Sequence, residues 1–359
     1  MILRPEQLHA LRLTRYEFHL RAGAEAVLPP FLGSTLRGAF GHALKALVCV
    51  VPHGDCGRCI LVERCLYPKL FETPVDKGLS PLLKDQDVRL LSKSQSTPLL
   101  SRNQDAPRPF IFIPPLPNMD SNFMRARDDL LRWRLRVQAG ESVIFGLSLL
   151  GDAIQELAYV IYAISSMAQS GLGAERASFA LEMVACLDAQ GNREIIYTPE
   201  TTRIPPPEKY QTTLGTLTQA RLSQLISKDE VTLRFITPTR NRVKGKVADS
   251  VDFARLVSML SRRLSLLVEI HGDAPLNYDY KTMIGGAREV AARASSLRLM
   301  ALERFSNRRK GKLELDGFMG DICFAGPAVQ ELLPLLAAGE FLHVGSGTAF
   351  GLGRYYIVT

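Results

Sequence analysis

Long apolar runs are absent from this sequence of 359 residues. No segment reaches the roughly 18 consecutive apolar residues that a membrane-spanning helix needs, so we expect no membrane association. The first residues also lack the apolar stretch of a secretory signal, which favours a cytoplasmic location. No internal repeat is found, so the fold has to be inferred from the order of the elements.

Cysteine is also scarce, and six cysteines in a cytoplasmic chain favour free thiols or metal ligands over a disulfide framework. Four of them follow the pattern C-x6-C-x2-C-x5-C in a polar loop without a core of its own. Thiolates at this spacing suit a tetrahedral metal site, and a metal ion would fold such a loop. We predict a structural zinc ion, with an iron–sulfur cluster as the second choice and reduced free thiols as the alternative, at Cys49, Cys56, Cys59 and Cys65.

The composition that is present suits two globular domains. Hydrophobic residues make up 46% of the chain, enough for two cores. The 44 Lys and Arg outnumber the 36 Asp and Glu, and this net charge of +8 favours a polyanionic partner. Residues 228–312 hold 18 Lys and Arg against 9 Asp and Glu, which indicates a nucleic-acid footprint. An ordinary basic protein is the alternative on charge alone.

Hydrophobic periodicity predicts an α+β protein built of two similar halves. Each half runs strand–helix–strand–strand–helix–strand, the order of the ferredoxin-like, or RRM-like, split βαβ unit. We predict helices at 33–48, 152–170, 250–271, 288–294 and 328–338, and strands at 10–21, 110–113, 131–137, 142–150, 179–187, 194–197, 231–236, 297–305, 312–324 and 350–358. The predicted domains are residues 1–202, with an insertion at about 49–117, and residues 229–359, joined by a stiff proline-containing linker at 203–228.

A glycine-rich segment lies near the C-terminus. Gly345, Gly347, Gly351 and Gly353 fall within nine residues, and glycines let a backbone approach a phosphate closely. The segment is not a Walker loop, because no Gly-Lys-Ser/Thr follows, and it is not a dinucleotide fingerprint, because a strand follows it. A plain turn before an edge strand is the alternative.

Four segments resemble one family in the expected order. Residues 344–355 resemble the C-terminal glycine-rich loop of the CRISPR-associated precursor-RNA processing endoribonucleases of the RAMP superfamily. Residues 234–240 resemble the segment that opens the family's second domain, 304–309 with 317–320 resemble its basic hairpin, and 30–41 resemble its first helix. The matches extend over nearly the whole chain.

The resemblance implies tandem ferredoxin-like RAMP domains and a metal-independent cut of CRISPR repeat RNA. The ribose 2′-hydroxyl attacks the adjacent phosphate and leaves a 2′,3′-cyclic phosphate, so DNA is not expected to be a substrate. Implied partners are repeat RNA, the released guide RNA and subunits of a CRISPR effector complex in a prokaryotic cytoplasm. The alternatives are a non-catalytic RAMP subunit that binds guide RNA and, from a different class, a metal-cluster redox protein.

The family often places a catalytic histidine on or just before the first helix, and His42 fits that position. Leu36, Phe40 and Leu44 form the apolar stripe of this helix, and His42 faces away from it. Lys45 lies three residues on along the polar side, where it would stabilise the phosphorane together with Arg37. The alternative is an ordinary surface histidine. The second histidine candidate, on the first predicted strand, is His19.

The RNA-binding candidates are basic residues of the second domain and residues of the glycine-rich loop. Placed beside the loop, the basic residues would follow an RNA backbone. Individually, each of them is more often part of a solvated surface. The predicted set is Arg240, Arg242, Lys244, Arg304, Asn307, Arg308, Arg309, Lys310, Gly345, Gly347, Thr348, Gly351, Gly353 and Arg354.

Overall fold

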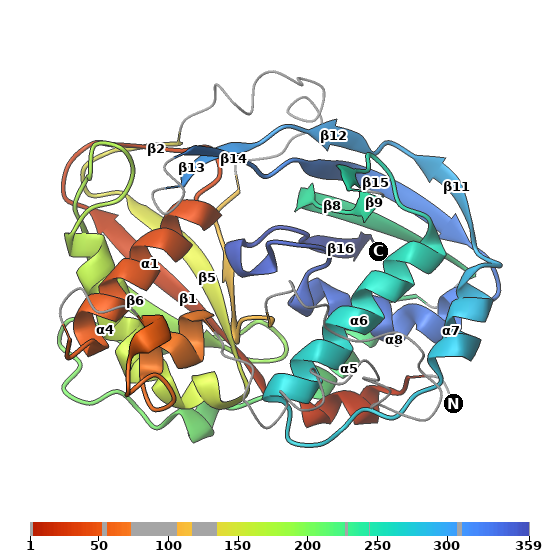
Figure 1. The fold of residues 1–359 in the computed structure, drawn as a ribbon, viewed down its shortest axis with the longest axis horizontal. Coiled ribbons are helices and arrows are strands. Elements are labelled where there is room, and N and C mark those ends of the chain that lie inside the picture. The colour runs from red at the N-terminus through yellow and green to blue at the C-terminus, as the bar shows by residue number, and fades with distance from the viewer. Residues whose placement is uncertain are drawn as a thin grey trace. The chain divides into compact units, whose positions relative to one another are not determined.

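The computed structural model describes residues 3–51, 56–72, 106–116, 135–226, 229–243, 245–306 and 311–358. They form two compact units (Figure 1). The N-terminal unit contains the described residues of 13–74 and 108–212. The C-terminal unit contains those of 1–12, 75–107 and 213–359, and each unit is considered by itself below.

The N-terminal unit is a five-stranded antiparallel sheet in the order β3-β5-β1-β6-β7. Its helices α1 and α4 pack against each other beside this sheet (Figure 1). A separate pair is formed by β2 and β4. The elements are β1 (Leu13–Ala22), β2 (Ala26–Leu28), α1 (Gly33–Val48), η2 (Cys56–Arg58), η3 (Pro68–Glu72), β3 (Phe110–Ile113), β4 (Leu135–Val137), β5 (Ser142–Leu150), η5 (Gly151–Glu156), α4 (Leu157–Gln169), β6 (Phe179–Leu187), β7 (Arg193–Tyr197) and η6 (Pro207–Tyr210).

The C-terminal unit repeats this plan with a sheet in the order β11-β15-β8-β16. The second half of β15 pairs with β11 and its first half with β12. Helices α6 and α8 pack against each other, and α8 also packs on β8 and β16. The elements are η1 (Pro5–Ala10), α5 (Leu214–Leu222), β8 (Glu230–Thr239), β9 (Arg242–Val243), β10 (Lys246–Val247), α6 (Phe253–His271), α7 (Tyr280–Ala287), β11 (Ala291–Ser295), β12 (Arg298–Met300), β13 (Glu303–Ser306), β14 (Gly311–Glu314), β15 (Gly317–Ala325), α8 (Ala328–Leu342), η7 (Thr348–Phe350) and β16 (Tyr355–Val358).

The two sheets have the same topology. In each, the third strand of the βαββαβ order lies between the first and the second, and the fourth pairs with the other edge of the first. This is the split βαβ arrangement, so the predicted α+β fold of tandem ferredoxin-like units is confirmed. In the N-terminal unit, β7 extends the sheet by one more strand.

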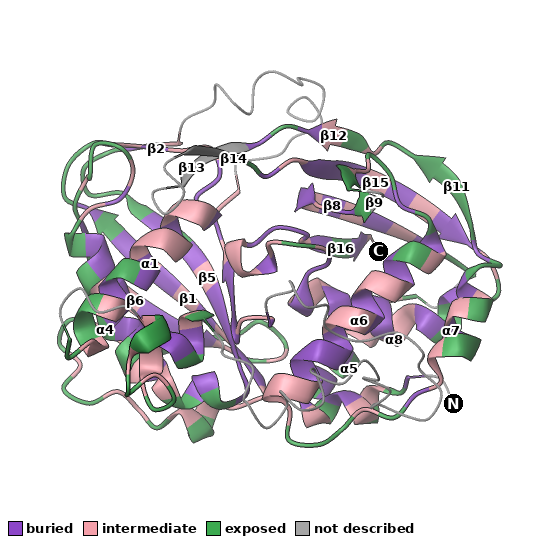
Figure 2. Cartoon of the chain, in the orientation of Figure 1, coloured by how far each residue is buried: buried purple, intermediate pink, exposed green. Residues whose placement is uncertain are grey.

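Alternating apolar residues build a core on the helix-covered side of each sheet (Figure 2). On β1, every second residue is buried, and the ring of Phe18 stacks on that of Phe145 at 5.4 Å between centroids. In the C-terminal unit, Phe235 on β8 lies 5.0 Å from Phe318 and 5.3 Å from Tyr355, again between ring centroids. These aromatic groups bury large apolar areas, and this burial holds each sheet to its helices.

The units divide the chain differently from the predicted domains at 1–202 and 229–359. The predicted first domain begins with η1, which belongs to the C-terminal unit, where it packs on α5 and Leu214 N donates to Leu11 O at 2.8 Å. The predicted linker at 203–228 contains α5 itself. Thr213 caps this helix by accepting a hydrogen bond from Thr216 N, and Leu217 is fully buried.

Several predicted elements need correction. Residues 288–294 were expected to be helical, but they lead into strand β11, whose residues are all exposed and therefore show no apolar alternation. The strand predicted at 131–137 is described from Leu135 as β4, which pairs with β2, and the strand predicted at 142–150 is β5, which lies between β1 and β3. The strand predicted at 350–358 begins only at Tyr355, after the η7 turn.

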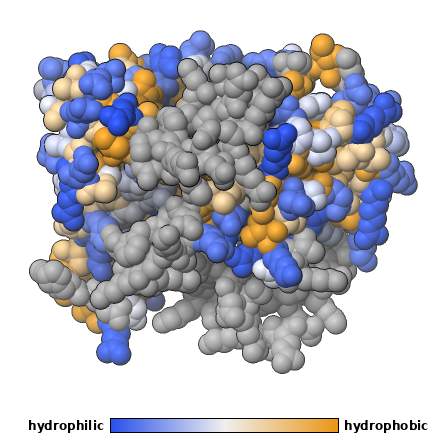
Figure 3. Space-filling view, turned by 90° about the horizontal axis from the view of Figure 1, so that it is seen from above, coloured by the Kyte–Doolittle hydropathy of each residue, from blue (hydrophilic) through white to orange (hydrophobic). Residues whose placement is uncertain are grey.

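Polar and apolar side chains are mixed on the outside of the described structure. Seen from above, hydrophobic residues occur in patches between hydrophilic ones over the described part of that face (Figure 3). The described residues include no helix that is both long and apolar enough to cross a bilayer.

Candidate nucleic-acid interface

Helix α1 has the predicted bounds and presents its histidine as predicted. Leu36, Phe40 and Leu44 are buried, and His42 is exposed. The buried apolar stripe holds the helix in place. The exposed imidazole can therefore be reached by a ligand from solvent. The buried stripe ends at Leu44, because Leu47 further along the helix is 47% exposed.

An aromatic segment that the sequence did not indicate covers one side of α1. The guanidinium carbon of Arg37 lies 4.4 Å from the ring centroid of Phe71, and the Nζ atom of Lys45 lies 5.6 Å from that of Tyr67. The two rings stack on each other at 5.4 Å between centroids. Both predicted catalytic cations therefore make cation–π contacts with one aromatic segment.

Gly41 explains how this segment approaches so closely. A Cβ atom at this position would lie 2.4 Å from the Phe71 ring, so only glycine fits without displacing the ring. Lys69 of the same segment pairs with Glu156 of η5 at 3.1 Å, which ties the segment to the start of α4. Residues 67–71 are thus part of the helical layer of the N-terminal unit.

The four clustered cysteines follow α1 in the sequence and are half-buried. Cys49 ends the helix, and its N–H donates to Lys45 O at 2.9 Å. The Lys45 side chain also makes a hydrogen bond to Cys56, whose thiol pKa is raised by burial and lowered in part by that lysine. Among the described residues, no three His, Cys, Asp or Glu side chains lie close enough together to hold a metal ion.

His19, the second histidine candidate, is engaged in an ion-pair network on β1. Its Nε2 atom lies 2.8 Å from Glu17 Oε1, and Arg193 donates to both oxygens of the same carboxylate at 2.8 and 3.1 Å. Burial opposes ionisation of Glu17, but the bonds from Arg193 and His19 outweigh it and lower the carboxyl pKa. This arrangement is typical of a satisfied sheet histidine.

The glycine-rich loop of the C-terminal unit has a tightly determined backbone. All four of its glycines have positive φ angles, between 72° and 87°. A Cβ atom on Gly353 would lie 1.7 Å from Val344 O, and one on Gly345 would lie 2.7 Å from Arg240 O. These two glycines are therefore required by the packing of the loop, whatever it binds.

Hydrogen bonds hold the loop against the end of β8. Val344 N donates to Gly353 O at 2.9 Å, and Gly353 N donates to Pro238 O at 3.1 Å. The buried hydroxyl of Thr237 donates to Gly351 O at 2.9 Å and accepts from Arg354 N at 2.8 Å. The loop is thus fixed before any ligand arrives, which lowers the entropy cost of binding.

Three of the predicted RNA-binding segments meet at this place. Arg240 O accepts a hydrogen bond from Ser346 N of the loop at 3.4 Å, and Arg240 Nε donates to Asp316 O at 3.1 Å. Asp316 also accepts from Leu302 N at 2.9 Å, and these two residues flank the β13–β14 hairpin. The glycine-rich loop, Arg240 and the base of the basic hairpin are therefore neighbours within one unit.

The structure describes some of the remaining predicted RNA-binding residues. Arg242 follows β8 and is exposed, Arg354 is half-buried, and Thr348 is buried in the loop. Arg304 lies on β13, opposite Leu313 in the register of the hairpin. The other predicted RNA-binding residues lie outside the described residues, and they are Lys244, Asn307, Arg308, Arg309 and Lys310.

A buried polar group that the sequence did not indicate lies behind the loop. His343 is 1% exposed, and burial together with Arg354 and Arg263 holds its pKa well below the usual value, so the imidazole is neutral. Burial also lowers the pKa of the Arg263 guanidinium to about 9. Its Nε atom donates to Leu342 O at 2.6 Å, next to His343.

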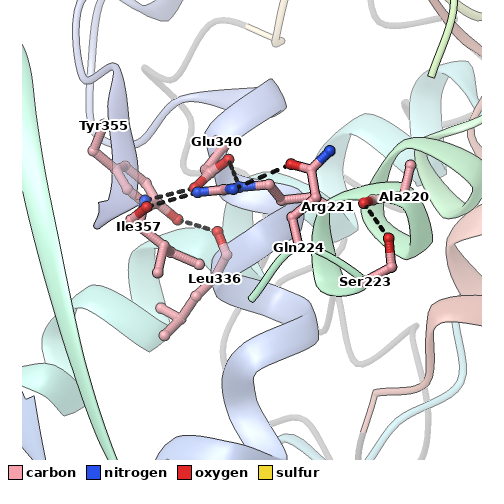
Figure 4. Close-up of polar contacts among 8 residues, drawn as sticks. All are labelled: Ala220, Arg221, Ser223, Gln224, Leu336, Glu340, Tyr355 and Ile357. Carbon is pink, nitrogen blue, oxygen red and sulfur yellow. Dashed lines mark hydrogen bonds and ion pairs between the residues drawn. The ribbon is translucent and has the colours of Figure 1, made fainter. Parts of the chain in front are cut away.

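Helix α5 is fastened to the strand that carries the loop (Figure 4). Arg221 donates from Nε to Glu340 Oε2 at 2.8 Å and from Nη2 to Ile357 O at 2.6 Å. Glu340 accepts from Ile357 N at 2.5 Å, and the Tyr355 hydroxyl donates to Leu336 O at 2.6 Å. The segment predicted as a linker is therefore an integral support of β16.

The fold and this loop define a protein of the RAMP class, with two ferredoxin-like units and a glycine-rich loop before the last strand. Two family models match consecutive parts of the chain. Residues 11–209 match the AF_1859_N family, described as an N-terminal domain, and residues 233–355 match the family described as CRISPR-associated endoribonuclease Cas6. The first match covers more than half of the chain, so the chain belongs to the AF_1859_N family, and with its Cas6 domain it is a Cas6-type CRISPR-associated protein.

One relative and several solved structures are similar to the chain over nearly its whole length. An uncharacterized protein of Archaeoglobus fulgidus is 25% identical over 352 residues, which cover 97% of this chain and 98% of the relative. Thermus thermophilus Cas6 has a similar fold, with a TM-score of 0.50, 14% identity, and coverage of 97% of this chain and 99% of that chain. A chain of a partial Cas6-RT-Cas1–Cas2 complex is similar with a TM-score of 0.54 and 12% identity, over 97% of this chain and 46% of that chain.

Proposed function

We propose that this chain cleaves CRISPR repeat RNA and thereby releases guide RNAs from a longer precursor. The observation that carries the proposal is the Cas6 domain match over residues 233–355, the part of the chain that contains the glycine-rich loop and the arginine beside it. A loop whose backbone is fixed by its own hydrogen bonds, next to arginines, suits the phosphates of an RNA strand.

The proposed reaction needs no metal ion. The 2′-hydroxyl beside the scissile phosphate gives up its proton to a base and attacks phosphorus. The bond from phosphorus to the 5′-oxygen of the next nucleotide breaks, this oxygen takes up a proton as a 5′-hydroxyl, and a 2′,3′-cyclic phosphate remains. His42 is proposed to move the proton, because its imidazole is exposed and histidine is the side chain suited to proton transfer near neutral pH. Arg37 and Lys45 are proposed to stabilise the negative charge of the phosphorane, for which their side chains have to turn from the aromatic rings toward the phosphate.

The RNA strand is proposed to follow the C-terminal unit along the glycine-rich loop. Arg240 after β8, Arg242 on β9 and Arg304 on β13 supply cations, and the loop supplies backbone N–H groups. The proposed set also includes Lys244, Asn307, Arg308, Arg309 and Lys310 on the strength of the sequence alone. Arg354 is half-buried and Thr348 is buried, and both are proposed to support the loop.

A second function is favoured by the cation–π contacts on α1. If Arg37 and Lys45 stay on the rings of Phe71 and Tyr67, the helix offers His42 without a neighbouring cation for the phosphorane. The chain would then bind guide RNA in the prokaryotic cytoplasm without cutting it, as a subunit of a CRISPR assembly. The similar chain of the partial Cas6-RT-Cas1–Cas2 complex makes CRISPR proteins reasonable partners.

Cleavage of synthetic repeat RNAs in EDTA separates the two functions. The panel contains hairpin-forming and unstructured repeats, each also prepared with a 2′-deoxy nucleotide at the cut site and as DNA. We expect cleavage of RNA in EDTA, none of the 2′-deoxy or DNA versions, and a product with a cyclic phosphate. His42→Ala should reduce the single-turnover rate by about 10²–10⁴-fold.

The controls distinguish lost chemistry from lost structure. Because His42 is exposed, His42→Ala should keep the unfolding transition and the RNA affinity of the parent. His19→Ala serves as the matched histidine control and should leave the cleavage rate within a factor of a few. Tight binding of a repeat without any cleavage would contradict the proposed endoribonuclease and support the non-catalytic binding subunit. If the chain bound no repeat at all, both proposed functions would be wrong.

A further inference from the structure

Helix α6 carries two arginines on one face, beside the predicted RNA-binding residues. Arg255 and Arg262 are seven residues apart, which is close to two helical turns, so they lie about 10 Å from each other along the helix axis. Arg255 is exposed and Arg262 is half-buried. The predicted RNA-binding set contains no residue of this helix, so this face has no partner assigned to it.

Hydrogen bonds join the start of this face to the segment that follows β8. Arg255 Nε donates to Asn241 Oδ1 at 3.1 Å, and Arg255 Nη2 donates to Arg242 O at 3.3 Å. Asn241 is only 2% exposed, and its carbonyl oxygen accepts from Ala248 N at 2.8 Å, so this anchor is well fixed. The arginine face of α6 is therefore held next to Arg242 by contacts within the C-terminal unit.

The same segment connects α6 to the glycine-rich loop. The carbonyl oxygen of Arg240, two residues before Arg242, accepts a hydrogen bond from Ser346 N of the loop at 3.4 Å. Starting from the loop, the cations follow in the order Arg240, Arg242, Arg255 and Arg262. An RNA strand that lies on the loop can therefore continue along this row without leaving the unit.

The bonds that orient Arg255 leave its positive charge available. Its two acceptors are an amide oxygen and a backbone carbonyl, which are neutral, and they use two of the five N–H donors of a guanidinium. Asp252, three residues earlier, is engaged as the cap of α6, where its carboxylate accepts from Arg255 N at 2.8 Å. Burial and the neighbouring Arg255 lower the pKa of Arg262, as expected where two cations lie close together.

The surface between the two arginines is polar and uncharged. Ser258 lies one turn from each of them, and its hydroxyl shares a hydrogen bond with that of Tyr280 on α7, at 2.9 Å between the oxygens. Both residues are half-buried. The single acidic residue of α6 is Glu269, seven residues beyond Arg262. An anion on this face would therefore meet guanidinium and hydroxyl groups without a carboxylate of α6 between them.

We propose that Arg255 and Arg262 bind backbone phosphates of the repeat RNA and extend its path from the glycine-rich loop onto helix α6. This inference rests on the proposed function, because the ligand is the repeat that the chain is proposed to cleave. Guanidinium groups about 10 Å apart along the helix would contact different phosphates. Phosphate contacts carry no sequence information, so they would add affinity for the strand and not recognition of its bases.

Binding of an uncleavable repeat tests the two contacts. The probe is a fluorescent repeat RNA with a 2′-deoxy nucleotide at the cut site, titrated with the full chain at several salt concentrations. Arg255→Gln and Arg262→Gln should each weaken binding by about fivefold at physiological salt and reduce the slope of log K against log salt by about 0.7.

Arg293→Gln is the matched control and should bind the probe as the parent does. This arginine is also exposed, but it lies on β11, at the edge of the sheet opposite to β16, which follows the loop. Arg255→Lys keeps the charge but loses the paired bonds to Asn241 and Arg242, so it should keep the salt slope of the parent. Repeats shortened from each end in turn should abolish the effect of Arg262→Gln for one end only.

The proposal is overturned if both glutamine variants bind the repeat with the affinity and the salt slope of the parent. It is also overturned if Arg255→Lys loses as much affinity as Arg255→Gln, because Arg255 would then act through the fold alone. In both cases the parent still binds and cleaves the repeat, and the proposed function stands. A parent chain that bound no repeat would contradict the proposed function itself, and this inference with it.

Discussion

The two units share one topology but build their candidate sites in different ways. In the N-terminal unit, the candidate residues are side chains on α1, and their surroundings are other side chains, above all the rings of Tyr67 and Phe71. In the C-terminal unit, the candidate site is a backbone loop between α8 and β16, fixed by hydrogen bonds to β8. A side-chain site can rearrange at low cost, whereas a backbone site is preformed and intolerant of change.

The largest effect is expected from replacing a glycine of the loop in the C-terminal unit. Gly353→Ala places a Cβ atom 1.7 Å from Val344 O at a φ of +72°, so the loop and its hydrogen bond from Val344 N cannot survive. We expect a loss of about 5 kcal/mol in the stability of the C-terminal unit. Native-state hydrogen exchange of the β16 amides measures it.

The matched variant in the N-terminal unit is Gly38→Ala on α1. No atom lies within 4 Å of the Cβ position there, and alanine is the better helix former by about 0.5–1 kcal/mol. This variant should therefore leave α1 intact or slightly more stable. Equal effects of the two substitutions would show that the loop is no more constrained than the helix.

The elements that could be predicted from the sequence are those whose buried residues recur at regular positions. Helix α1 and strand β6 have the predicted bounds, since each shows a clear periodicity of buried residues. Strand β11 was predicted as helical because all five of its residues are exposed, so it carries no periodic signal. Helix α5 was missed because prolines precede it and only a few of its residues are buried.

The same distinction applies to the candidate sites. Features marked by a local sequence pattern could be predicted, whereas those that depend on long-range packing could not. The glycine-rich loop was found because four glycines are close in sequence, although the reason for Gly353 is a clash with Val344 that only the fold reveals. The contact of Tyr67 and Phe71 with α1 left one signal in the sequence, which is the glycine at position 41 within the helix. Buried charged groups such as Arg263 and Glu340 gave none, because they look like surface residues in the sequence.

A second comparison uses one ion pair from each unit, and the expected loss of stability is smaller than for the glycine variant. Arg221 and Glu340 in the C-terminal unit have only 16% and 10% of their side chains exposed. Arg221→Ala leaves Glu340 buried without its partner and removes the bond to Ile357 O, so we expect a loss of about 3 kcal/mol, measured by denaturant unfolding. Glu340→Gln in the Arg221→Ala background should restore part of it, because it removes the unpaired charge.

The matched pair in the N-terminal unit is Lys209 with Glu194. It also spans 2.8 Å, but its side chains are 59% and 56% exposed. Solvent screening leaves such a pair with little net stabilisation, so Lys209→Ala should leave the unfolding transition unchanged. If the lysine and arginine variants lost the same stability, the role of α5 as a support of β16 would have to be abandoned.

The pH dependence of stability is expected to give a smaller effect than the Gly353 and Arg221 variants. The pKa of His343 in the folded chain is held well below the usual value of about 6.5 by burial and by Arg354 and Arg263. A depressed pKa means that the unfolded chain binds the proton first. The stabilisation is therefore complete above about pH 6.5 and decreases as the pH falls, by at most about 1.4 kcal/mol per pH unit.

His343→Asn isolates this contribution from that of the carboxylates. Asparagine does not titrate, and the strained backbone at this position, with φ +60° and ψ 168°, burdens histidine and asparagine alike. Unfolding free energies of the parent and the variant, measured from pH 7 to pH 5, should converge as the pH falls, because only the parent loses the histidine contribution. Parallel curves would mean that His343 takes up its proton equally in both states, and the neutral, buried imidazole behind the glycine-rich loop would then be an incorrect description.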